Sequence, residues 1–89
     1  MTFEFNGMLL RAVDDQRTVS VQAANLQEAL TELTSRFPRA KAILLDNSGQ
    51  LHQAHRMTLN GELIPRPDSA LPLSEGDRIE FHTAIAGGG

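Results

Sequence analysis

The last three residues of the chain, Gly87, Gly88 and Gly89, are the first candidates for chemistry, although they have no side chains. Glycine lets a backbone pass through a channel too narrow for any Cβ atom, and it adopts dihedral angles that other residues avoid. An extended end of this kind can carry its terminal carboxylate into the active site of another protein. There an ATP-dependent enzyme can adenylate the carboxylate, and a sulfur or amine nucleophile can then displace AMP. An ordinary frayed chain end is the alternative interpretation.

The three histidines are the next candidates, for a metal site. His52 and His55 would share one face of a helix, but Gly49 precedes them and a strand pattern follows. No third ligand is spaced to complete a zinc set. We therefore expect an exposed pair in a loop and no metal site. His82 alternates with Phe81 and is expected to face solvent.

Paired carboxylates and nucleophiles give no enzymatic pattern. Glu75 and Asp77 flank a glycine just before a strand, and Asp14-Asp15 fits a turn. No serine lies in a glycine-flanked elbow, and the seven glycines form neither G-x-G-x-x-G nor a phosphate loop. The chain has no cysteine, which excludes thiolate nucleophiles, disulfides and thiolate metal sites. The sequence therefore predicts a protein that is not itself an enzyme.

Composition restricts the classes of partner that the chain is expected to bind. Eighty-nine residues with 40% apolar content suffice for one domain with one modest core. The net charge of -3 leaves no basic footprint for nucleic acid, so proteins or small molecules are the expected partners. No apolar run approaches the roughly 20 residues of a membrane span, and the first residues lack the layout of a signal peptide. We expect a cytoplasmic protein without membrane association.

Alternation of apolar and polar residues predicts five strands. They are residues 2–5, 18–21, 57–59, 62–64 and 78–82, with Phe3, Phe5, Ile79 and Phe81 on the core side. The first two strands can pair as an antiparallel hairpin. Asn60-Gly61 is a strong hairpin signal between the third and fourth, because both residues adopt positive φ.

One good helix is predicted between the strands. Its apolar stripe repeats at helical spacing and consists of Leu26, Ala29, Leu30, Leu33 and Phe37. Asn25 is the expected N-cap, Glu28 completes a capping box, and Pro38 ends the helix near residue 37. Residues 40–46 fit one or two further helical turns, whereas residues 7–16 are ambiguous. Strands at both ends of the chain with a helix between them predict an α+β fold, with one sheet face packed on that helix.

This order of elements, the LNGELIP hairpin, the LPLSEGDRIEF run and the terminal AIAGGG together resemble the ubiquitin-like β-grasp sulfur carriers of the ThiS/MoaD-like family. The resemblance covers essentially the whole chain and is closest in type to the cysteine-pathway carrier or the molybdopterin synthase small subunit. Its most specific parts are L-x-E/D-G-D-x-I/V-x-F, here Leu73 to Phe81, and the diglycine end. It implies a β-grasp domain over residues 1–83, with a mixed sheet of four to five strands on one main helix. Residues 84–89 would be a flexible C-terminal tail.

In that family a ubiquitin-activating-type enzyme uses ATP to adenylate the C-terminal glycine. A sulfurtransferase or persulfide donor then converts it to a thiocarboxylate, which gives sulfur to a downstream acceptor enzyme. The resemblance implies that Gly89 and Gly88 bear this chemistry and that Gly87 and Ala86 form the tail. It also implies that Ile85 and Phe81 dock a partner, and that the carrier itself binds no cofactor. From the residue type alone, Phe81 is more often a core residue than a docking residue.

Two departures from the family pattern leave alternatives open. His82-Thr83-Ala84 stands where many relatives have prolines, and three glycines leave open whether Gly89 is activated or trimmed to Gly88. The family pattern also fits a ubiquitin-like modifier that forms isopeptide bonds. A molybdopterin synthase small subunit and an interaction module with an inert tail are the remaining alternatives.

Overall fold

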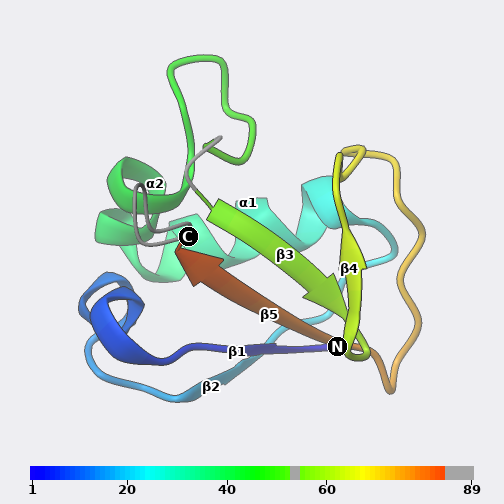
Figure 1. Ribbon diagram of the computed structural model, residues 1–89, viewed down its shortest axis with the longest axis horizontal. Coiled ribbons are helices and arrows are strands. Elements are labelled where there is room, and N and C mark those ends of the chain that lie inside the picture. Colours follow the sequence, from blue (N-terminus) through cyan, green and yellow to red (C-terminus); the bar gives the residue numbers. More distant parts are fainter. Residues whose placement is uncertain (53–54, 84–89) are drawn as a thin grey trace.

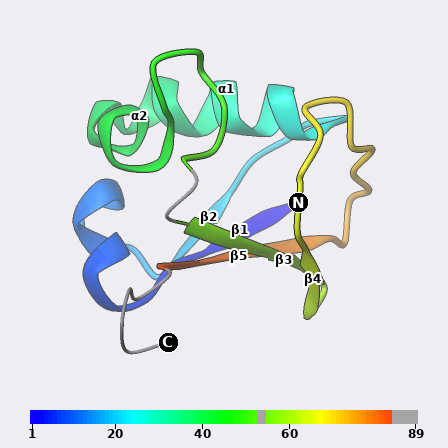
Figure 2. The same cartoon turned by 45° about the horizontal axis from the view of Figure 1, so that its top comes forward.

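Five strands form one mixed sheet in the order β2-β1-β5-β3-β4 (Figure 1). The computed structural model describes residues 1–52 and 55–83. The strands are β1 Thr2–Glu4, β2 Thr18–Ser20, β3 His55–Leu59, β4 Glu62–Ile64 and β5 Arg78–Thr83. The helices are η1 Gly7–Val13, α1 Leu26–Arg36 and α2 Pro38–Leu44. Figure 2 shows α1 and α2 together on one side of the sheet, which confirms the predicted α+β class.

The first and last strands lie side by side in the sheet. β1 pairs with β2 antiparallel, as predicted, and with β5 in parallel. Cross-strand neighbours share a face, so Val19, Phe3 and Ile79 form one buried row under the helices. This row joins residues far apart in the sequence, and it holds β5 between β1 and β3.

The second hairpin forms as its turn residues predict. Asn60 and Gly61 have φ values of 53° and 85°, and β3 and β4 pair antiparallel around them. A type I′ turn needs positive φ at both positions, and its twist matches that of the flanking strands. The hairpin thereby supplies the β4 edge of the sheet.

The caps of α1 also follow the sequence. The Asn25 side-chain oxygen accepts a hydrogen bond from the Glu28 N–H at 2.9 Å. The Glu28 carboxylate in turn accepts from the Ala24 N–H at 3.1 Å, one residue before the usual capping-box position. α1 ends at Arg36, and Pro38 opens α2 instead of only ending α1. Proline is tolerated there because the first turn of a helix needs no N–H donor.

The ambiguous stretch after β1 is the 3₁₀ helix η1. Leu9, Ala12 and Val13 are buried, and Asp14 and Asp15 close the helix with φ values of 53° and 64°. η1 packs against α2 and also contacts β5. Its apolar residues therefore extend the core at the end of the sheet where β5 finishes (Figure 2).

Candidate functional site at the end of the central strand

The strand that leads to the glycine end is anchored by aromatic packing. The Phe81 side chain is 0% exposed, and its ring stacks on Phe3 with centroids 5.6 Å apart. The Phe5 ring lies 6.0 Å from the Phe81 ring at a tilt. β5 is also paired on both sides, to β1 and β3. The described residues therefore end on a strand that is packed and paired at the centre of the sheet.

The predicted site residues fall into two groups. Ile85, Ala86, Gly87, Gly88 and Gly89 lie outside the described residues. Phe81 is described, and its burial places the side chain in the core, so a partner cannot contact it on the surface of this structure.

The sheet face opposite the helices is mainly polar. One row crosses all five strands and consists of Thr18, Glu4, Glu80, Thr58 and Leu63. Four of these five residues are polar, so this row offers little apolar surface beside β5.

An ion pair and a side-chain hydrogen bond connect residues of this polar face. The Arg78 Nε lies 3.2 Å from the Glu4 carboxylate. The Asn6 amide donates to one Glu80 oxygen at 3.0 Å, and His82 Nε2 lies 3.6 Å from the other. His82 is exposed, as predicted. Such partly exposed pairs contribute about 0 to 1 kcal/mol each, so they orient the face more than they stabilise the fold.

Two large apolar side chains are exposed among the described residues. Met8 on η1 is 77% exposed and Leu63 on β4 is 52% exposed. η1 contacts β5, whereas β4 is separated from β5 by β3. We did not single out either residue from the sequence. The outward position of Leu63 follows once the register of the hairpin is known, but Met8 lies in the segment whose periodicity was ambiguous.

Asp77 acts in a turn, as predicted. Its carboxylate accepts hydrogen bonds from Asn60 Nδ2 at 3.0 Å and from the Ser74 N–H at 2.8 Å. The Asn60 amide hydrogen bond, together with the Ser74 backbone bond, lowers the pKa of Asp77 below its ordinary value. Asn60 also accepts from the Arg78 N–H at 3.0 Å. The carboxylate therefore ties the start of β5 to the hairpin turn.

The histidine pair is only partly as expected. His52 is an exposed loop residue, but His55 begins β3 and is half-buried. His55 Nε2 lies 2.7 Å from the Ile43 carbonyl oxygen, which can only accept, so this nitrogen carries the proton. Its Nδ1 is buried without a hydrogen-bond partner. Within residues 1–52 and 55–83, no three histidine or acidic side chains converge as a metal site would require.

No helix in this part of the chain is long and apolar enough to cross a membrane.

The sheet order and the helix packed on it define a ubiquitin-like β-grasp protein, as solved structures show. The chain is similar to a chain of the Amycolatopsis orientalis BexX/CysO complex, with 22% identity and a TM-score of 0.83 over 97% of each chain. It is also similar to SAMP1 from Haloferax volcanii, with 20% identity and a TM-score of 0.81, over 97% of this chain and 96% of that one. Mycobacterium tuberculosis CysO matches at 22% identity and a TM-score of 0.80, over 94% of this chain and 98% of its own.

The sequence itself also identifies the family. The model of the ThiS family matches residues 3–88, nearly the whole chain, and the protein therefore belongs to the ThiS family. No curated protein sequence matches the chain.

Proposed function

We propose that this protein is a sulfur carrier whose C-terminal glycine is adenylated and converted to a thiocarboxylate. The thiocarboxylate then donates sulfur in cysteine, cofactor or specialised-metabolite biosynthesis, in the cytoplasm. One combined observation carries the proposal: residues 3–88 match the ThiS family, and the chain ends on three glycines shortly after a central strand.

The chemistry needs only a carboxylate on this chain. An oxygen of the terminal carboxylate attacks the α-phosphorus of ATP in the active site of a ubiquitin-activating-type enzyme, and pyrophosphate leaves. A persulfide sulfur of the donor then attacks the acyl carbon and displaces AMP. A second thiol cleaves the resulting acyl disulfide and releases the thiocarboxylate. The persulfide and the thiol that cleaves the acyl disulfide both come from partner proteins, because this chain has no cysteine.

Among the described residues, β5 fixes the point in the sheet after which the C-terminal residues follow. β5 is anchored by the buried Phe81 and is paired on both sides. It can therefore stay in the sheet while a partner binds the residues that follow it. The six residues from 84 to 89 span at most about 20 Å when fully extended. A partner's nucleotide site must therefore lie within that distance of the β5 end, which makes the surface around β5 part of the contact.

Intact-mass spectrometry tests the proposal. The purified chain is incubated with a ubiquitin-activating-type enzyme, ATP and a sulfur source, and we expect the mass gain of one oxygen replaced by sulfur. The same spectrum shows whether Gly89 is retained or trimmed to Gly88. A chain lacking Gly88 and Gly89 is the control and should stay unmodified. An unchanged wild-type mass with several cognate enzymes would contradict the proposal.

A ubiquitin-like modifier is the second candidate. It is favoured by the likeness to Haloferax volcanii SAMP1, which is described as a small archaeal modifier protein. A modifier would form an isopeptide bond from its C-terminal glycine to lysines of other proteins. Tryptic peptides with a glycine remnant on lysine would support this candidate, and their absence alongside a thiocarboxylate would favour the carrier.

A further inference from the structure

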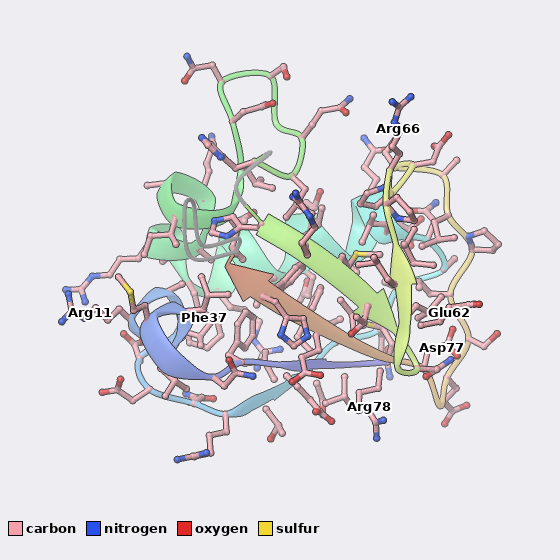
Figure 3. All side chains as sticks on the ribbon, viewed as in Figure 1. Arg11, Phe37, Glu62, Arg66, Asp77 and Arg78 are labelled. Carbon is pink, nitrogen blue, oxygen red and sulfur yellow. The ribbon has the colours of Figure 1, made fainter. Side chains whose placement is uncertain are left out.

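A hollow of about 690 Å³ lies beside β4 and the start of β3. We call it the basic cleft, and the residues that matter for its chemistry are His52, His55, Arg56, Arg66, Leu63 and Asp46. In Figure 3, Arg66 extends from the segment that follows β4. The chemistry proposed for the C-terminal end does not use this cleft.

The cleft has an excess of cationic groups in a chain whose net charge is -3. Arg56 and Arg66 line it, against the single carboxylate of Asp46. That carboxylate is directed to its own loop, where one oxygen accepts from the Ser48 N–H at 2.9 Å, the Ser48 hydroxyl at 2.7 Å and the Gln50 N–H at 3.1 Å. The Arg66 guanidinium forms no hydrogen bond or ion pair with any described residue. The cleft is therefore complementary to negative charge.

Apolar groups adjoin the cationic ones. Leu63 lines the cleft and is 52% exposed. A second hollow of about 310 Å³ shares Leu51 and Pro67 with the cleft and continues along Leu30 of α1. A small inorganic anion would leave these apolar walls in water. A polypeptide segment with acidic and apolar side chains would cover both kinds of surface.

The cleft also lies close to the functional end of the sheet. Arg56 is the cross-strand partner of His82, one residue before β5 ends at Thr83. Neighbouring strands are about 5 Å apart, so the Arg56 backbone is about that far from the strand that leads to the glycines. A protein that takes up the C-terminal end is therefore near enough to contact the cleft as well.

We infer that the basic cleft receives an acidic segment of the activating enzyme that accepts the C-terminal end. This inference rests on the proposed function, because it assumes that such an enzyme binds the chain. Complementary charges at the rim of an interface act mainly on the rate of association and fall with salt. Arg66 is the group to test, because its side chain is exposed and its replacement breaks no hydrogen bond or ion pair among the described residues.

Adenylation kinetics provide the first experiment. Arg66→Glu should lower kcat/KM for the activating enzyme by about five- to tenfold at low salt, mainly through KM, and the difference should shrink in high salt. Arg17→Glu is the matched control, because Arg17 is exposed, lies just before β2 at the opposite edge and has no side-chain hydrogen bond or ion pair with any described residue. Equal kcat/KM for wild type and both variants would overturn the inference while the proposed function stands.

A titration that needs no enzyme distinguishes a failure of the acidic-segment inference from a failure of the proposed function. Acetylated hexaglutamate, hexalysine and inorganic phosphate are added in turn to the ¹⁵N-labelled full chain. Hexaglutamate should shift the amide signals of Arg56, Leu63 and Arg66, and Arg66→Glu should abolish these shifts. Shifts elsewhere, or shifts that phosphate alone reproduces in full, would overturn the acidic-segment inference. If wild type is never adenylated but the cleft binds hexaglutamate, the proposed function fails, and with it the assignment of the activating enzyme as the partner.

Discussion

Replacement of Phe81 by alanine tests whether this residue serves the core or an exposed docking surface. The ring is 0% exposed and contacts the rings of Phe3 and Phe5 at centroid distances of 5.6 and 6.0 Å. A buried Phe→Ala change costs about 3 to 5 kcal/mol, because apolar transfer free energy is lost and a cavity remains. An 89-residue domain is typically stable by about 4 to 13 kcal/mol. Phe81→Ala should therefore remove a large part of the free energy of unfolding.

Urea unfolding followed by far-UV circular dichroism measures this loss, since the chain has no tryptophan or tyrosine for fluorescence. With a denaturant slope of about 1.5 kcal/mol per molar, the midpoint should fall by at least about 2 M. Leu63→Ala is the control, because Leu63 lies in the same sheet but is 52% exposed, and it should cost less than about 1 kcal/mol.

Equal midpoints for the two variants would refute the core assignment. A loss of adenylation kcat/KM greater than the unfolded fraction of Phe81→Ala explains would restore a docking role for this side chain.

Three further substitutions test local features of the fold. Asn25→Ala removes the bond to the Glu28 N–H and should cost about 1 kcal/mol, lowering the midpoint of thermal unfolding by about 4 to 8 °C, whereas Asn25→Ser should retain most of the stability. Gly61→Ala places a side chain at φ 85° and should cost about 1 to 2 kcal/mol in urea unfolding. Gly76→Ala is its control, since Gly76 has no positive φ and an added Cβ meets no atom within 4 Å, and a similar loss there would argue against the strained turn. Asp77 has its pKa lowered in the folded state, so the unfolded chain binds its proton more readily. Its contribution is present above the ordinary value of 3.8 and is lost as pH falls through the folded-state pKa. Asp77→Asn should therefore lose less stability than wild type between about pH 6 and pH 2 in urea unfolding, and an identical loss in the two proteins would contradict this assignment.

Local patterns predicted most of the secondary structure because they depend on neighbouring residues. The Asn25 cap, the apolar stripe of α1 and the Asn60-Gly61 turn each act within a few residues of the chain. The turn assignment of Asp77 rests on the same kind of local rule, and the structure confirms it. η1 was not predicted, because residues 7–16 match neither the strand nor the helix period. Its side chains are buried through contact with α2, which lies elsewhere in the sequence.

The sequence alone predicted the family, because its short motifs can be recognised without a folded context, and the family match over residues 3–88 confirms it. The adenylation and thiocarboxylate chemistry of the three glycines stays a prediction from the sequence. Only the tertiary structure decided that β5 lies between β1 and β3, since parallel pairing of two distant segments leaves no local pattern. That pairing buried Phe81 and turned a polar row toward solvent. The basic cleft likewise exists only in three dimensions, because folding brings Asp46, Arg56 and Arg66 around one hollow.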